Sequence, residues 1–281
     1  MYRGKTISLS FPPFTPWVKR IIIACTGIYI VQVVLGTAAP GLGVGKYLLA
    51  YFGLIPALAV QHGYVWQLVT YSLLHGGLWH VLTNMLTLWM FGSQEEQDWG
   101  SRRFIEFYLF CVVGAALVTI GVAYLGWGMD AYTPTVGASG GIYGLLIAFG
   151  MLYGDRELIL FPIPVAIKAK YLVGILMLIV LVSAFQPSQG GVANFAHLGG
   201  ALFGFLYLKF LPKGGIGFSA SEKYFGLRNS YYRWKRKRAA RKFEVYMRDH
   251  DRKVTFDEHG NYVPPDDNDK TNGGSKSGWV N

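Results

Sequence analysis

Charged side chains are scarce in this chain of 281 residues, at 15%, and acidic ones are scarcer still, with 16 Asp and Glu against 26 Lys and Arg. Soluble domains carry about 25% charged residues. Hydrophobic residues make up 52% of the chain, and its mean hydropathy is +0.30. The shortage of charge excludes an ordinary soluble domain and predicts a membrane protein. The aromatic content of 16% fits belts of Trp and Tyr at the two membrane interfaces.

Cysteine is nearly absent, and the usual zinc-protease motif is missing altogether. Cys25 and Cys111 each lie inside an apolar run, where a free cysteine behaves as a small hydrophobe, so a disulfide framework is excluded. The redox compartment stays open. His75, His80 and His197 could form a metal site, but there is no H-E-x-x-H, and neutral ligands alone make a poor zinc-protease site. We expect neither a metal nor a cofactor.

Long apolar segments are abundant, and they predict an all-α polytopic membrane protein. A spanning helix needs about 20 mostly apolar residues. Six candidates meet or approach this length, at residues 20–36, 75–92, 104–126, 139–153, 170–186 and 194–211. The first, which follows Lys19, also resembles a signal peptide. We expect it to be retained, because five remaining spans would leave the basic tail on the wrong side of the membrane.

The basic residues between the segments predict the orientation. They concentrate before the first span and in alternate loops, and the other loops hold almost none. Cytoplasmic loops carry the excess of Lys and Arg, so both termini should lie in the cytoplasm. The residues concerned are Arg3, Lys5, Lys19 and Arg20 before span one, Arg102 and Arg103 after span two, and Arg156, Lys168 and Lys170 after span four, against Lys46 alone in the opposite loops.

Spans two, four and six then run from outside to inside, so the polar residues near their starts share one depth. These residues are His75, His80, Asn84, Ser139 and His197. The fourth span has only 15 residues, about 22 Å of helix against a hydrocarbon core of about 30 Å. If its inner end reaches the cytoplasmic interface, Ser139 starts several ångströms below the outer surface. Irregular backbone before it must then be shielded by protein or line a water-filled cavity.

Ser139 is the candidate nucleophile. It stands in a glycine-rich run, where Gly137, Gly140 and Gly141 permit a tight turn and backbone N–H groups at the helix start can face an oxyanion. Serine needs a base to remove its proton, and histidine is the usual one. Taken alone, the run is better explained by a small-xxx-small helix contact through Gly140 and Gly144.

Span six favours the chemical interpretation. Ala196, Gly200 and Gly204 fall on one helical stripe next to His197, and small residues on both spans allow close approach of Ser139 and His197. Tyr143 lies one turn below Ser139, where its ring could stack on the imidazole. No carboxylate lies in a span core, so we expect a Ser–His dyad without an acidic third member.

His80 and Asn84 are candidates for oxyanion stabilisation. They are four residues apart, so both side chains project from one face of span two. Two buried donors could hold a developing negative charge, an effect worth several kcal/mol in a water-poor site. A plain inter-helix hydrogen bond is the alternative.

Together these motifs resemble the rhomboid family of intramembrane serine proteases, over roughly residues 15–212. They are His75-x4-His80-x3-Asn84, Gly137-Ala138-Ser139-Gly140 and Ala196-His197-x2-Gly200-x3-Gly204. The resemblance implies a six-helix bundle with Ser139 as nucleophile, His197 as base, and His80, Asn84 and the Ser139 N–H as oxyanion stabilisers. His75, Tyr143, Gly137, Gly140, Gly200 and Gly204 take supporting roles.

The resemblance also extends to the flanking segments. It places Glu96 and Gly100 in the family's segment after span two, and makes 37–74 a partly embedded first loop. That loop often has Trp-Arg in the family, whereas this chain has Trp66-Gln67, which leaves the usual arginine contacts in doubt but not the chemistry. We expect an integral protein of a bacterial plasma (inner) membrane, with its active site toward the outer face.

The chain divides into a cytoplasmic N-terminal segment (1–19), the six-helix domain (20–212) and a basic cytoplasmic tail (213–281). Residues 229–243 hold seven Lys or Arg and should favour anionic lipid; RNA binding is the less favoured alternative, and we expect no nucleic-acid partner. From about residue 255 the polar composition predicts disorder, with at most a short ordered motif.

Three functions compete. The leading hypothesis is an endopeptidase that cuts single-span membrane proteins near the outer ends of their helices. A catalytically dead relative that binds membrane proteins would typically lack the serine or the histidine, and both are present. A small transporter would need charged or ion-coordinating residues near the bilayer centre, and the sequence shows none.

Overall fold

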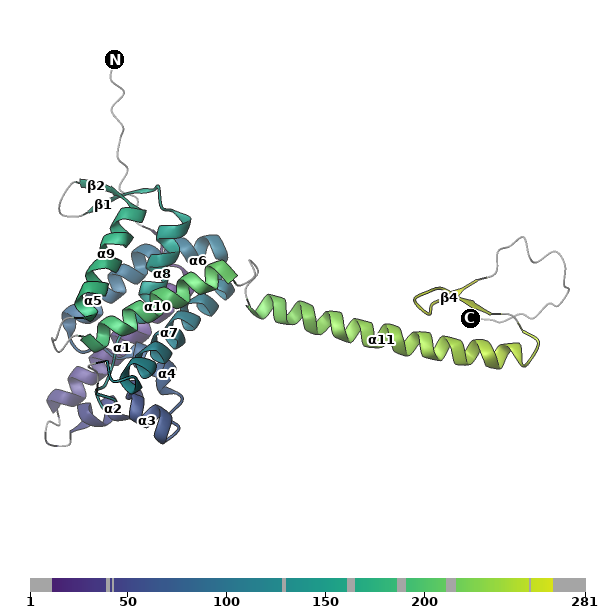
Figure 1. The fold of residues 1–281 in the computed structure, drawn as a ribbon, viewed down its shortest axis with the longest axis horizontal. Coiled ribbons are helices and arrows are strands. Elements are labelled where there is room, and N and C mark those ends of the chain that lie inside the picture. Colours follow the sequence, from purple (N-terminus) through teal and green to yellow (C-terminus); the bar gives the residue numbers. More distant parts are fainter. Residues whose placement is uncertain are drawn as a thin grey trace, which may run out of the picture. The chain divides into compact units, whose positions relative to one another are not determined.

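The computed structural model describes residues 12–264 except 39, 40, 42, 128, 129, 161–164, 186–190, 211–215 and 253. Parts of the predicted N-terminal segment (1–11) and tail (265–281) therefore lie outside the described residues. The chain forms two compact units, residues 1–215 and 216–281 (Figure 1).

Three helices form the centre of the first unit. Helix α10 (Gly191–Phe210) packs extensively against α7 (Ser101–Tyr124) and α8 (Ser139–Leu152), and α9 (Ala169–Ala184) covers their flank. Helix α1 (Pro16–Ala38) adds Val18, Ile21 and Cys25 to the same apolar core. The core is thus continuous from the first helix to the last of this unit.

The second predicted span differs from the expectation. We predicted one helix over 75–92, but helix α5 (Leu78–Thr87) begins three residues later, passes through a π-helical turn η3 (Leu88–Gly92), and continues as α6 (Ser93–Trp99). The late start follows Gly76-Gly77, where Gly77 is extended. His75 therefore precedes the helix instead of lying early in it. The helix ends at Gly100, whose φ of 79° suits glycine.

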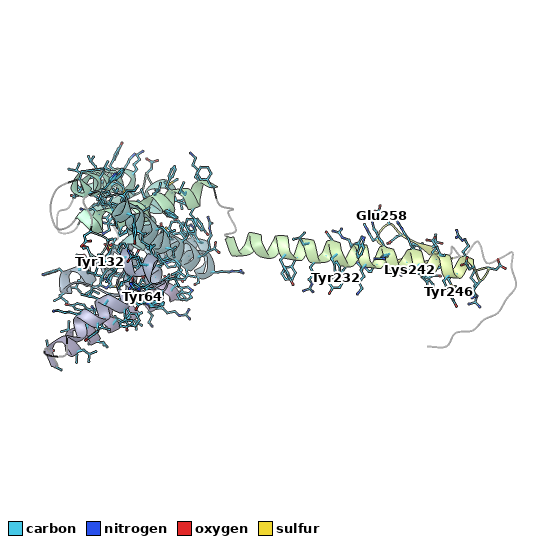
Figure 2. All side chains as sticks on the ribbon, turned by 60° about the horizontal axis from the view of Figure 1, so that its bottom comes forward. Tyr64, Tyr132, Tyr232, Lys242, Tyr246 and Glu258 are labelled. Atoms are coloured by element: carbon cyan, nitrogen blue, oxygen red, sulfur yellow. The ribbon has the colours of Figure 1, made fainter. Side chains whose placement is uncertain are left out.

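The predicted first loop is built of short helices at one end of this unit (Figure 1). An antiparallel bridge between Leu54 and Thr135 fastens this loop to the segment just before α8. The labelled Tyr64 and Tyr132 belong to these two segments (Figure 2). The short helices are α2 (Val44–Phe52), α3 (Pro56–Gln61), α4 (Gln67–Thr70) and the 3-10 turn η2 (Tyr71–Leu73).

An antiparallel hairpin lies at the opposite end of the unit, between α8 and α9 (Figure 1). Strand β1 (Glu157–Leu160) pairs with β2 (Val165–Lys168), with Glu157 opposite Lys168. At its base, Asp155 accepts hydrogen bonds from Lys170 at 2.7 Å and Lys168 at 3.4 Å. These ion pairs lower the pKa of the exposed Asp155 carboxyl.

Among the described residues, two helices are long and apolar enough to cross a membrane, α1 and α7. Helices α8 and α9 are apolar but shorter, with 14 and 16 residues. The mostly helical fold agrees with the predicted fold class, whereas the count of six spans stays a prediction.

The second unit contains one long helix, α11 (Ile216–Arg248), and a small hairpin of β3 (Thr255–Phe256) and β4 (Tyr262–Val263). We predicted disorder from about residue 255 with at most a short ordered motif, and residues 255–263 form such a motif. Its turn is held by Asp257, whose carboxylate accepts the backbone N–H groups of His259 and Asn261, each at 2.8 Å. These bonds lower the pKa of the exposed Asp257 carboxyl.

Candidate active site

Ser139 opens helix α8, and Gly137 controls how closely the preceding backbone approaches its neighbours. Gly137 has a φ of 125°, which L side chains rarely adopt. A Cβ placed there would lie 2.7 Å from His80 Nε2 and 3.6 Å from Ser139 Oγ. The Gly137 N–H donates to the Tyr71 carbonyl at 2.9 Å. Glycine is thus needed here both for backbone conformation and for space beside His80.

The structure brings Ser139 and His197 into contact across two helices. Ser139 Oγ lies 2.8 Å from His197 Nε2, although 58 residues separate them in the chain. This is hydrogen-bond distance, as a nucleophile and its base require. His197 Nδ1 is buried and makes no hydrogen bond to any residue that the structure describes.

Glycine-to-glycine contacts produce this proximity. A Cβ on Gly200 would overlap the carbonyl oxygen of Gly140, and a Cβ on Gly204 would lie 2.9 Å from Gly144 Cα. The predicted stripe on span six therefore meets the small residues of α8 backbone to backbone. The small-xxx-small interpretation and the catalytic interpretation are compatible, because close helix packing is what brings the serine to the histidine.

Tyr143 stacks on the histidine ring, as its position one turn below Ser139 predicts. The ring centroids are 4.3 Å apart and the planes differ by 14°. A stacked ring limits rotation of the imidazole, which keeps Nε2 directed at Ser139.

His80 lies near the serine, since both side chains approach Gly137, and Asn84 follows one turn along the same helix. His80 Nδ1 accepts the Gly76 N–H at 3.4 Å, which leaves the proton of a neutral imidazole on Nε2, the nitrogen that lies against Gly137. Asn84 Nδ2 donates to the His80 carbonyl at 2.8 Å, inside its own helix. The amide keeps a second N–H for another acceptor. His75 is buried and packs its ring edge against His80, with centroids 5.1 Å apart.

Gln67 stands where the family that the sequence resembles often has arginine, and the structure gives this glutamine a role of its own. Gln67 is fully buried; its Oε1 accepts the Ile55 N–H at 3.1 Å, and its Nε2 donates to the Ala50 carbonyl at 2.8 Å. Trp66 Nε1 donates to the Tyr51 carbonyl at 2.7 Å. The pair therefore ties the end of α2 to the start of α3, and a glutamine amide holds this part of the first loop together.

Sequence reasoning missed Tyr71 and the structural role of Glu96. The buried Tyr71 donates its hydroxyl to the Val112 carbonyl at 2.8 Å, and its own carbonyl accepts the Gly137 N–H, which links the first loop, α7 and the serine loop. The carboxylate of Glu96 accepts the N–H groups of Trp17 and Val18 at 3.0 Å, and so caps α1. No local pattern marks Tyr71, whereas the acidic residues that directly follow an apolar segment could have drawn attention to Glu96.

The described residues contain no group of three or more His, Cys, Asp or Glu side chains arranged to hold a metal ion.

A bundle of apolar helices with a serine–histidine contact at a helix start is the arrangement expected of an intramembrane serine hydrolase, and comparison with known proteins identifies the family. Residues 62–213 match the model of the Rhomboid domain. The chain belongs to the rhomboid family and is an integral membrane protein.

Similar proteins come from bacteria, plants and fungi. The chain is 32% identical over 172 residues to rhomboid protease GluP of Bacillus subtilis, covering 59% of this chain and 30% of the relative. It is 33% identical over 175 residues to RHOMBOID-like protein 1 of Arabidopsis thaliana (59% and 40%), and 30% identical over 140 residues to the mitochondrial Rhomboid protein 1 of Saccharomyces cerevisiae (50% and 40%). The chain thus spans less than half the length of each of these three relatives.

Proposed function

We propose that this chain is an intramembrane serine endopeptidase with Ser139 as nucleophile and His197 as general base. The observation that carries the proposal is the 2.8 Å contact between Ser139 Oγ and His197 Nε2. Membership of the rhomboid family and the name of the GluP relative, a rhomboid protease, support the same reaction.

The reaction follows from these positions. Ser139 Oγ attacks the scissile carbonyl carbon while its proton passes to His197 Nε2, and the carbonyl oxygen becomes an oxyanion. The intermediate collapses, the C–N bond breaks, and His197 gives the proton to the leaving amine. Water then attacks the acyl-enzyme, again with His197 as base, which releases the new carboxyl group and restores Ser139.

Three donors are proposed for the oxyanion: His80 Nε2–H, the second N–H of Asn84, and the backbone N–H of Ser139. The N–H groups of a helix's first turn have no intrahelical acceptor, so that of Ser139 is available. The loss of one preorganised donor of this kind typically lowers turnover by about 10²–10³-fold, or roughly 3–4 kcal/mol. The unpartnered Nδ1 of His197 supports a dyad without an acidic member among the described residues.

The proposed substrates are single-span membrane proteins cut near the outer end of the helix. We propose six spans, both termini in the cytoplasm, and a bacterial plasma membrane. The distribution of Lys and Arg in the sequence supports this orientation. The first-loop helices and the β1–β2 hairpin lie at opposite ends of the first unit (Figure 1), and we propose that these ends face the outer and the cytoplasmic side respectively.

The domain limits are proposed as an N-terminal segment (1–19), the protease domain (20–212) and a basic tail (213–281). We propose anionic headgroups as the partners of the tail, because seven Lys or Arg lie within 229–243. Each basic residue near an anionic surface contributes about 1 kcal/mol.

One experiment tests the proposed activity: purified full-length protein, reconstituted in lipid, with a fluorogenic single-span substrate. Ser139→Ala and His197→Ala should each reduce cleavage to background, whereas wild type should cleave at a defined position. Thermal unfolding of both variants supplies the folding control. Equal cleavage by all three proteins would refute the proposal, and binding without cleavage by wild type would identify an inactive relative.

A further inference from the structure

The first half of α11 carries a row of exposed aromatic and aliphatic side chains. Tyr224, Leu227, Tyr231 and Trp234 are spaced by three, four and three residues, so they share one face of the helix. Their exposed fractions are 60, 75, 56 and 55%. We call these four residues the aromatic stripe. So much exposed apolar area in one row is typical of a surface that contacts a partner.

The opposite face of the same helix is polar. Asn229, Arg233 and Arg236 are spaced there by four and three residues, half a turn away from the aromatic stripe. Asn229 and Arg233 are exposed. Phe225 and Tyr232 are also exposed, at 58 and 50%, and they lie on the flank between the two faces, beside Arg236. The first half of α11 therefore has a polar face at Asn229 and Arg233, and an apolar side that is broader than the aromatic stripe alone.

The hairpin of the second unit leaves the aromatic stripe uncovered. It packs farther along the helix, where Ala240 is buried and Phe243 meets Phe256 with ring centroids 6.2 Å apart. Tyr232, Lys242 and Tyr246 are labelled along α11 in Figure 2, with Glu258 in the hairpin beside it. Nothing among the described residues of this unit shields the stripe, whose side chains keep more than half of their area exposed.

Basic residues are interleaved with the aromatic rings. The guanidinium of Arg238 lies 5.5 Å from the ring centroid of Trp234, and that of Arg228 lies 5.9 Å from Tyr232. No Asp or Glu occurs between Glu222 and Glu244. The region is therefore positively charged as well as apolar, a combination that fits an anionic lipid surface: Trp and Tyr rings sit at headgroup level, and long basic side chains reach the phosphates.

The chain itself favours lipid over other anionic polymers. Only five residues separate the end of α10 at Phe210 from the start of α11 at Ile216, and five residues span at most about 18 Å. A helix tethered so closely to an element of the membrane domain meets lipid headgroups at high effective concentration. Interleaved basic and aromatic residues also suit single-stranded nucleic acid, so the experiment includes RNA as a competitor.

We propose that the first half of α11 lies in the plane of the membrane interface, with the aromatic stripe inserted among the headgroups of anionic lipids and the Asn229 face toward water. The proposal rests on the proposed membrane attachment of the tail, but not on the proposed peptidase activity. Beyond charge attraction, the proposal specifies which face of the helix enters the membrane. It also predicts an apolar contribution to membrane binding that salt does not screen.

The test uses full-length Ser139→Ala protein in liposomes, with single nitroxide labels on introduced cysteines. Cys25 and Cys111 are buried free thiols, so labelling is directed to the introduced position. Leu227→Cys and Tyr231→Cys report on the aromatic stripe, and Asn229→Cys and Arg233→Cys are the matched controls on the opposite face. The readout is the ratio of oxygen to water-soluble nickel accessibility, in vesicles with and without phosphatidylglycerol.

Labels at 227 and 231 should show ratios severalfold above those at 229 and 233, in anionic vesicles only. With the label kept at 227, Trp234→Ser should lower the ratio in high salt, and the opposite-face change Arg233→Ser should not. Equal, water-like ratios at all four positions would overturn the proposal. The proposal would also be overturned if the labels at 227 and 231 became inaccessible to nickel only when single-stranded RNA is added. If the stripe inserts but wild type cleaves nothing, the peptidase proposal alone fails.

Discussion

Replacing Gly200 by alanine should separate the two helices that hold the catalytic pair. A Cβ at this position overlaps the Gly140 carbonyl oxygen and lies 3.0 Å from Gly140 Cα. A carbon–oxygen contact needs about 3.3 Å, so α8 and α10 must move apart by about 1 Å or more. The 2.8 Å distance between Ser139 Oγ and His197 Nε2 then lengthens beyond hydrogen-bond range.

The size of the effect follows from this displacement. Misplacement by about 1 Å can reduce turnover by roughly 10²-fold, and forcing an extra carbon into a packed contact costs about 1–3 kcal/mol of stability. Activity of Gly200→Ala should therefore fall by about two orders of magnitude in kcat/KM, with a lower Tm. The assay is cleavage of the single-span substrate at substrate concentrations below KM, together with thermal unfolding in the same detergent.

The matched control is Gly174→Ala in α9. A Cβ at Gly174 meets nothing within 4 Å, and alanine is the better helix former by about 0.8–1 kcal/mol. Gly174→Ala should keep full activity and an equal or higher Tm. Wild-type kcat/KM in Gly200→Ala would refute the reasoning, because it would mean that the close glycine contact does not hold the serine to the histidine.

Three further predictions concern the oxyanion site, the first loop and the cap of α1. Asn84→Ala should lower kcat by about 10–10³-fold with little change in KM, because the amide acts on the transition state; a change confined to KM would contradict that role. Gln67→Ala should lower stability by about 1–3 kcal/mol, since it leaves the Ile55 N–H without its acceptor, whereas the exposed Gln61→Ala should be near neutral in the same unfolding assay. At Glu96, burial raises the pKa, but hydrogen bonds from the Ser101 hydroxyl and two backbone N–H groups outweigh it and hold the pKa below its ordinary value of 4.5. The stabilisation from this depressed pKa is present above about pH 4.5 and is lost as the pH falls through the folded-state pKa. Wild type should therefore lose more stability than Glu96→Gln between about pH 5 and pH 3, and parallel pH profiles would contradict the capping role.

Much of the site could be predicted from the sequence because its motifs are local patterns on helices. The spacing of Gly200 and Gly204, and of Ser139 and Tyr143, follows from helical periodicity, so the shared faces could be read from residue numbers alone. The start of the second helix was placed wrongly, at His75, because Gly76 and Gly77 disrupt it, and composition alone did not show where the helix resumes. No sequence pattern indicated that α11 is one continuous helix through Gly226.

Apolar composition by itself determined that the chain enters a membrane, since segments with so few charges are stable only where their surface is removed from water. Periodicity determined which residues share a helix face. Only the tertiary structure decided the contacts between distant segments: the 2.8 Å approach of Ser139 to His197, the burial of Gln67 in the first loop, and the capping of α1 by Glu96. The physical reason is that helix faces are set by local backbone geometry, whereas their partners depend on how whole helices pack, which no local pattern encodes.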